Sequence, residues 1–96
     1  MRRAARIDDN QKEIVDGIRR FGATVVSLAA VGNGCPDLLV GFRARCFLFE
    51  IKDGGKPKSR RQLTPDQKKF FAEWQGQCRV ITSLEEAITV LTESYQ

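Results

Sequence analysis

The chain opens with a spacing of apolar residues that is typical of a helix. From about Asp9 to Phe21, one stripe recurs with the 3.6-residue period of an α-helix, and it comprises Ile7, Gln11, Ile14, Ile18 and Phe21. Asp8 or Asp9 can cap the start of this helix, and Gly22 can end it. We therefore expect a first helix that turns one face toward the core.

Three short apolar runs follow, and each is typical of a β-strand. They span Ala23 to Ala30, Asp37 to Phe42 and Arg45 to Lys52. The first run breaks at Gly32-Asn33-Gly34, and a tight turn near Arg43-Ala44 separates the other two. The pattern predicts one strand followed by a hairpin.

The second half of the chain begins with a strong helix start. In Thr64-Pro65-Asp66-Gln67, Thr64 can be the N-cap, Pro65 the first helical residue and Gln67 the partner in a capping box. This helix is expected to run to about Gln75, where Gly76 stops it.

One more strand and one more helix complete the chain. The strand is expected from Gln77 to Ile81, and Ser83 can cap a last helix from Leu84 to about Ser94. The order helix, three strands, helix, strand, helix predicts an α/β fold, in which helices flank a mixed four-stranded sheet. A length of 96 residues fits one domain, so we expect residues 1–96 to form a single unit.

Composition excludes several classes of protein. Hydrophobic residues make up 42% and charged residues 29% of the chain, as in ordinary globular domains, and no apolar run approaches the roughly 18 residues of a membrane span. We expect a cytoplasmic protein that needs neither a membrane nor a small-molecule cofactor. The three cysteines form no CxxC pair and histidine is absent, which argues against a structural zinc site. Cys46 and Cys78 lie in apolar strands and are interpreted as small core residues.

Basic residues concentrate in the segment from Gly54 to Arg61, which we call the basic loop. The net charge is +4, and the basic loop carries Lys56, Lys58, Arg60 and Arg61. Such a cluster can follow a phosphate backbone and release its counterions. The alternative is a solvated loop with no ligand. Arg2, Arg3 and Arg6 form a second basic cluster.

The expected hairpin places two carboxylates opposite each other. If it is centred on Arg43-Ala44, Asp37 lies directly across from Glu50, with Cβ atoms about 4.5–5.5 Å apart. A two- or four-residue loop keeps this pairing, whereas a three-residue loop would shift the register. Lys52 shares the face of Glu50, and the opposite face carries Phe47, Phe49 and Ile51.

Two facing carboxylates repel each other unless a cation lies between them. Oxygen ligands with open water positions suit Mg²⁺ or Mn²⁺, which can activate water and stabilise charge on a phosphoryl oxygen. Lys52 beside such an ion can orient the water or neutralise the transition state. The alternative is that Glu50 and Lys52 are exposed residues of an edge strand, with Asp37 a turn residue after Pro36.

These residues resemble a known nuclease motif. Pro36-Asp37 followed by Glu50-x-Lys52 is similar to PD-(D/E)xK, and the element order matches the αβββαβα core of restriction-endonuclease-like proteins. The closer resemblance is to the VRR-NUC family, found alone in phages and bacteria and at the end of the Fanconi-associated nuclease. It covers nearly the whole chain and rests on "GNGCPDLLVG", "LFEIKDG", "PKSRRQLTPDQ" and "VITSLEEAI".

The resemblance implies a set of site residues. Asp37, Glu50 and the backbone carbonyl of Ile51 would bind Mg²⁺ or Mn²⁺, Lys52 would be catalytic, and Gln67 would be an active-site residue. The alternative is that Gln67 serves its capping box, and both roles could hold only if different atoms serve each, because a side chain that reaches back to the cap cannot also reach the ion. Its stripe with Phe70, Phe71 and Trp74 faces the sheet, which favours the active-site role.

The first helix departs from the family pattern. Many relatives carry a glutamate there that completes the metal site. In this chain Asn10 or Gln11 is favoured for that place, because Asn10 lies near the inward stripe, and Glu13 is the alternative.

The resemblance as a whole implies a metal-dependent DNA endonuclease that hydrolyses phosphodiester bonds, selective for branched or Holliday-junction-like DNA. A homodimer is expected, since one chain offers one metal site and cutting two strands takes two. One alternative is a non-catalytic nucleic-acid-binding module on the same fold. Another is a protein-interaction domain, for which Phe42 and Trp74 would need to be exposed.

Overall fold

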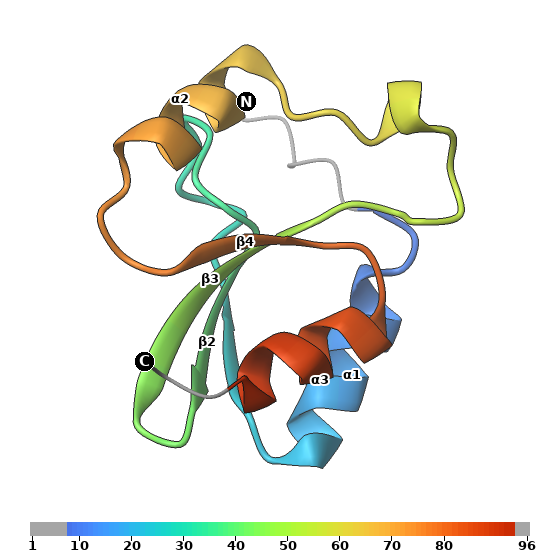
Figure 1. The fold of residues 1–96 in the computed structure, drawn as a ribbon, viewed down its shortest axis with the longest axis vertical. Helices are drawn as coiled ribbons and strands as arrows, with labels where there is room; N and C mark the ends of the chain where they lie inside the picture. Colours follow the sequence, from blue (N-terminus) through green and yellow to red (C-terminus); the bar gives the residue numbers. More distant parts are fainter. Residues whose placement is uncertain (1–7, 94–96) are drawn as a thin grey trace.

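The computed structural model describes residues 8–93, in which helices and a four-stranded sheet alternate along the chain (Figure 1). The second basic cluster (Arg2, Arg3 and Arg6), Ile7 and the expected helix end at Ser94 lie outside the described residues. The elements are α1 (Gln11–Phe21), β1 (Thr24–Ser27), β2 (Leu38–Phe42), β3 (Arg45–Ile51), the 3-10 turn η1 (Lys58–Arg60), α2 (Pro65–Glu73), β4 (Cys78–Ile81) and α3 (Leu84–Thr92). The predicted order of helices and strands is confirmed.

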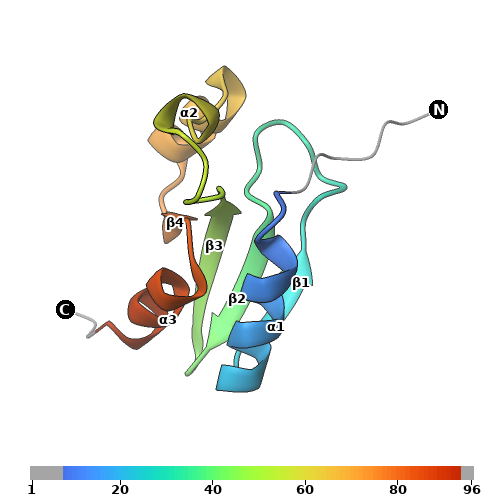
Figure 2. The ribbon, with the colours of Figure 1, turned by 90° about the vertical axis from the view of Figure 1, so that its right-hand side faces the viewer.

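The sheet is mixed, as the sequence predicts. Its strand order is β1-β2-β3-β4, with antiparallel pairing from β1 to β3 and parallel pairing between β3 and β4. The parallel pair arises because the chain crosses over through η1 and α2 before it returns as β4. β3 is therefore a central strand, and its carboxyl end points toward the segment that carries α2 (Figure 2).

Helices α1 and α3 cover one face of the sheet (Figure 2). The face between them and the strands is apolar and includes Ile14, Ile18, Val40, Phe47, Phe49, Ile51, Ile81 and Leu91. The two helices approach closely at Gly17, where an added Cβ would collide with the side chain of Leu84. The prediction that Phe47, Phe49 and Ile51 share the inward face of β3 is confirmed.

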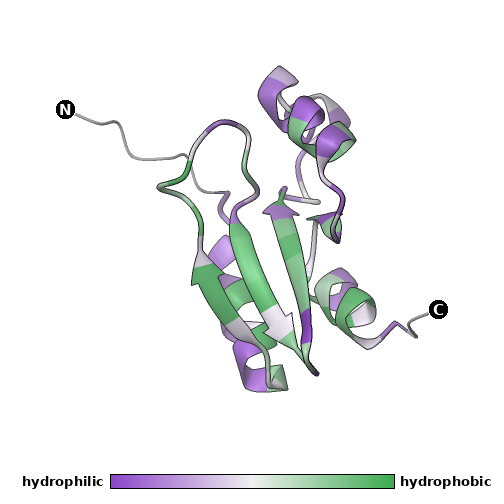
Figure 3. Ribbon diagram, turned by 90° about the vertical axis from the view of Figure 1, so that its left-hand side faces the viewer, coloured by the Kyte–Doolittle hydropathy of each residue, from purple (hydrophilic) through white to green (hydrophobic). Residues whose placement is uncertain are grey.

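The opposite face of the sheet is covered much less. Figure 3 shows this face, on which the strands are largely hydrophobic, and α2 lies beyond one end of the sheet. Leu39 and Val26 are exposed on it. The prediction that Cys46 is a core residue is wrong, since alternation along β3 turns its side chain away from α1 and α3 and leaves it exposed. Cys78 is half-buried.

The first strand is shorter than the expected run from Ala23 to Ala30. β1 ends at Ser27, and the chain then turns, with the amide of Val31 donating to the carbonyl oxygen of Leu28 at 2.9 Å. Gly34 has a φ of +77° and lies so close to α2 that a Cβ would collide with the backbone of Asp66. The glycine-rich loop therefore bends over to meet the start of α2 instead of continuing the strand.

Two further observations limit the alternatives. Phe42 is buried, with 9% of its surface exposed, whereas Trp74 is 47% exposed. The interaction-domain alternative required both to be exposed, so Phe42 argues against it. None of the helices within residues 8–93 is long and apolar enough to cross a membrane.

Candidate active site

The β2–β3 hairpin sets the geometry of the site. Its turn residues Arg43 and Ala44 have φ values of +51° and +64°, the left-handed conformation that a two-residue primed turn needs. The strands pair from Phe42 opposite Arg45 to Leu38 opposite Phe49, which is the predicted register. One further step along this register brings Asp37 opposite Glu50.

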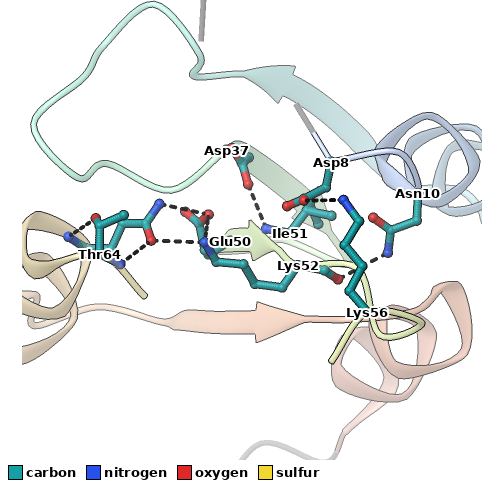
Figure 4. Close-up of polar contacts among 9 residues, drawn as sticks. Asp8, Asn10, Asp37, Glu50, Ile51, Lys52, Lys56 and Thr64 are labelled. Carbon is teal, nitrogen blue, oxygen red and sulfur yellow. Dashed lines mark hydrogen bonds and ion pairs between the residues drawn. The ribbon is translucent and has the colours of Figure 1, made fainter. Parts of the chain in front are cut away.

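Asp37 is anchored by the backbone of the facing strand. Its Oδ2 accepts a hydrogen bond from the amide of Ile51 at 2.7 Å (Figure 4). Burial raises the pKa of Asp37 even though this amide bond lowers it, and the negative charge of Asp8 raises it further. The charge of Asp37 in turn raises the pKa of Glu50, so the ionisation of one carboxyl group affects the other.

Glu50 is a buried charged residue, with only 3% of its surface exposed. Its Oε2 accepts from Nε2 of Gln67 at 3.2 Å and lies 3.6 Å from Nζ of Lys52. Its Oε1 is buried and has no hydrogen-bond partner within residues 8–93. Burial, and then the charge of Asp37, raise the pKa of Glu50 to about 8 despite the opposing effect of Lys52. The edge-strand alternative, in which Glu50 is exposed, is wrong.

Lys52 lies directly after β3, and hydrogen bonds fix both its side chain and its backbone. Its Nζ donates to Oε1 of Gln67 at 3.1 Å, and its side chain is 12% exposed. Its backbone amide donates to the carbonyl oxygen of Ile81 at 3.0 Å, which ties it to the end of β4. The ammonium is therefore fixed beside Glu50 by the fold, as the two-residue period of the strand predicts.

Gln67 serves the capping box and the carboxylate site at once. Its backbone amide donates to Oγ1 of Thr64, and its Oε1 accepts from the amide of Thr64 at 2.9 Å and from Lys52. Its Nε2 donates to Glu50. The two roles coexist under the condition expected from the sequence, because different atoms serve them: Oε1 accepts from the cap and Nε2 donates to Glu50. The capping box itself orients Gln67 toward the site.

The three candidates on the first helix lie outside the carboxylate pair. Nδ2 of Asn10 donates to the carbonyl oxygens of Lys52 and Thr82 at 3.2 and 3.1 Å, so Asn10 positions the backbone behind Lys52. Gln11 is buried but lines a separate groove between α1 and β1, and Glu13 is exposed.

Asp8 is the acidic residue that the sequence reasoning missed. The sequence pattern indicates Asp8 only as a helix cap, whereas in the structure it precedes α1 and faces the pocket that contains Asp37 and Glu50. Its charge raises the pKa of Asp37, which shows that the two carboxylates interact. Within residues 8–93, no three His, Cys, Asp or Glu side chains come together closely enough to form a complete metal centre. The side-chain carboxylates that lie paired in this pocket are those of Asp37 and Glu50.

Two of the four basic residues of the basic loop line the pocket. Lys56 and Arg60 line the pocket, and Nζ of Lys56 lies 4.0 Å from Asp8 and 3.9 Å from Asp9. Lys58 is exposed and does not line the pocket, and Arg61 is half-buried. The structure therefore brings two of the four predicted DNA contacts to the pocket.

The pocket as a whole combines acidic and basic side chains, most of which Figure 4 draws. Its volume is about 570 Å³, and it is lined by Asp8, Asp37, Glu50, Lys52, Lys56, Arg60, Thr64 and Gln67. A buried carboxylate pair attracts a divalent cation, and a rim of ammonium and guanidinium groups attracts phosphate.

The comparisons with known proteins gave no match. The chain matched no family model, no curated protein and no solved structure. The functional argument therefore rests on the geometry and electrostatics of this pocket.

Proposed function

We propose that this protein is a DNA endonuclease of the VRR-NUC type, which uses Mg²⁺ or Mn²⁺ to hydrolyse phosphodiester bonds. The observation that carries the proposal is the buried carboxylate of Glu50, paired with Asp37 and contacted by Lys52 and Gln67. A buried pair of acids with raised pKa values is costly to a fold unless it binds something, and such pairs concentrate at functional sites.

The residues present fit a hard divalent cation. Asp37, Glu50 and the backbone carbonyl of Ile51 would hold it, and the unpartnered Oε1 of Glu50 is a ligand atom without another role among residues 8–93. Asp8 faces the same pocket and would contact the cation through water. When bound, the cation neutralises the carboxylates and supplies Lewis acidity toward the phosphodiester.

The remaining side chains position the reactants. Lys52 presents a fixed ammonium to the phosphate or the attacking water, and Gln67 holds that ammonium at 3.1 Å. Asn10 fixes the backbone of Lys52 from behind and acts as a positioning residue. Lys56 and Arg60 at the rim, together with Lys58 and Arg61 in the same loop, bind the DNA backbone.

The proposed substrate is branched DNA, including four-way junctions, and the proposed active form is a homodimer. Each chain carries one carboxylate pair, so two copies would be needed to cut two strands. The non-catalytic binding module is the competing function, and the contacts of Lys52 and Gln67 with Glu50 argue for catalysis. Binding of DNA alone would not require these contacts.

A cleavage panel tests the proposal. The protein is incubated with labelled four-way junctions, flaps, duplexes and single strands in Mg²⁺, in Mn²⁺ and in EDTA. We expect cleavage of branched DNA in both metals and none in EDTA. Salt-dependent DNA binding without cleavage in either metal would instead support the non-catalytic module.

A further inference from the structure

A second concave surface is lined by residues of β2, β3 and α2 and lies on the sheet face away from α1 and α3, the face that Figure 3 views. We call it the apolar groove. It has a volume of about 570 Å³, and its lining includes Leu28, Val31, Leu39, Leu48, Phe70 and Trp74. No lining residue is charged. The groove therefore suits an uncharged planar or apolar group and would exclude a phosphate.

The apolar groove is continuous with the surroundings of the carboxylate site. Leu28, Gly32 and Cys35 line the groove and also line a small hollow beside it. The other wall of that hollow contains Asp37, Thr64 and Gln67, which also line the active-site pocket. A strand whose phosphate lies at the carboxylates can thus reach the groove with a neighbouring nucleotide.

The wall of the apolar groove carries a stacked pair of aromatic rings. The centroids of Phe70 and Trp74 are 5.1 Å apart with an interplanar angle of 17°, and Trp74 is 47% exposed. Gln67 and Phe70 are three residues apart on one side of α2, and Trp74, which directly follows the helix, stacks on Phe70. The separation of seven residue steps from Gln67 to Trp74 corresponds to roughly 10 Å along a helix axis, about the rise of three stacked nucleotides.

We propose that the apolar groove receives an unpaired base within about three nucleotides of the cut phosphate, with Trp74 as the stacking platform. This inference rests on the proposed nuclease function and narrows its substrate class to DNA with unpaired nucleotides beside the cut. A paired base in a duplex is stacked on its neighbours and cannot enter a protein groove without being displaced.

A second copy of this chain is the other possible occupant, and the observations favour it less. A stable interface buries about 800 Å² on each partner. The large apolar side chains exposed within residues 8–93 are Phe21, Val26, Val31, Leu39 and Trp74, and only the last three line the groove. The groove is concave and leads to the carboxylates, which suits a nucleotide better than a flat protein surface.

Fluorescence gives a direct binding test, because Trp74 is the only tryptophan in the sequence. The wild-type protein in EDTA is titrated with a single-stranded oligonucleotide and with an equal one in which the bases are replaced by abasic residues. We expect the first to quench or shift the emission of Trp74 and the second to do so far less. Equal effects of the two oligonucleotides would overturn the proposal.

Variants give a test that does not depend on fluorescence. Trp74→Ala should weaken binding of a DNA with an unpaired stretch by about five- to 150-fold, the range for loss of one base–aromatic stack. Trp74→Phe should retain most of the affinity, and Phe21→Ala, which removes an exposed aromatic ring outside the groove, should bind like wild type. A single abasic residue near the cut should weaken wild type but not Trp74→Ala.

The outcomes separate the two proposals. If Trp74→Ala responds to the abasic residue as strongly as wild type does, the base does not lie on Trp74. If light scattering shows a wild-type dimer and a monomeric Trp74→Ala, the groove belongs to a second copy and the proposal is wrong. If wild type cuts no DNA in Mg²⁺ or Mn²⁺, the nuclease proposal fails, and the titration in EDTA still decides the occupant of the groove.

Discussion

Replacing Glu50 by Gln should stabilise the metal-free protein at alkaline pH. Burial and Asp37 raise the pKa of Glu50 from 4.5 to about 8. The folded protein therefore keeps this proton up to about pH 8, whereas the unfolded chain loses it near pH 4.5. Raising the pH through this window favours the unfolded chain, so wild-type stability should fall between pH 5 and pH 9.

The size of the effect follows from the same shift. At about 1.4 kcal/mol per pH unit, ionising Glu50 in the fold costs at most about 5 kcal/mol. Glu50→Gln removes this cost, and the pKa of about 8 already includes the opposing effect of Lys52. We expect the variant to be more stable than wild type by up to about 5 kcal/mol at pH 9 and by much less at pH 5.

Urea denaturation in EDTA, followed by the fluorescence of Trp74, measures both proteins. Glu13→Gln is the matched control, since Glu13 is exposed on α1, and its stability should follow that of wild type. Adding Mg²⁺ at pH 9 should stabilise wild type and leave Glu50→Gln almost unchanged. A variant that is less stable than wild type at pH 9 would refute the reasoning, because Glu50 would then be a stabilising ion pair and not a strained one.

Three further predictions concern the neighbours of Glu50. Lys52→Arg should lower the single-turnover cleavage rate roughly 100-fold or more, because a guanidinium is too large for the space between Gln67 and Glu50. Lys68→Arg on α2 is the control. Near-native cleavage by Lys52→Arg would limit Lys52 to supplying charge. Replacing Lys56, Lys58, Arg60 and Arg61 by Ser should reduce the salt dependence of DNA binding by roughly one unit of slope per lost phosphate contact. Replacing Arg19 and Arg20 by Ser is the control and should leave the slope unchanged. An unchanged slope in the basic-loop variant would mean that the loop is a solvated surface. Thr64→Ala and Gln67→Ala should each lower the free energy of unfolding, measured by urea denaturation, by about 1 kcal/mol. Only Gln67→Ala should also strongly reduce cleavage. Equal losses of cleavage in the two variants would contradict a separate active-site role for Gln67.

The sequence predicted the carboxylate pair because its geometry depends on local rules. A two-residue turn at Arg43-Ala44 fixes the register of the hairpin, and the register alone places Asp37 opposite Glu50. The start of α2 was equally predictable, since Thr64, Pro65 and Gln67 carry their signal within four residues.

The rest depends on tertiary packing, which local patterns do not contain. Asp8 reaches the pocket because of the way the chain enters α1, and periodicity along that helix could indicate only residues within it. The contact of Asn10 with Lys52 and Thr82 joins segments 42 and 72 residues apart. Cys46 occupies a strand position whose exposure is decided by which sheet face the helices cover, and the sequence does not show that α1 and α3 share one face.

The most direct test of the central claim is a metal titration of DNA cleavage by wild type and Asp37→Asn. Single-turnover rates on a labelled branched DNA are measured across a range of Mg²⁺ concentrations, with Glu13→Gln as the control. The account predicts a saturable, metal-dependent rate for wild type and the control, and no measurable cleavage by Asp37→Asn at any Mg²⁺ concentration while it still binds the DNA. Cleavage by Asp37→Asn at the wild-type rate and with the same metal dependence would contradict the claim.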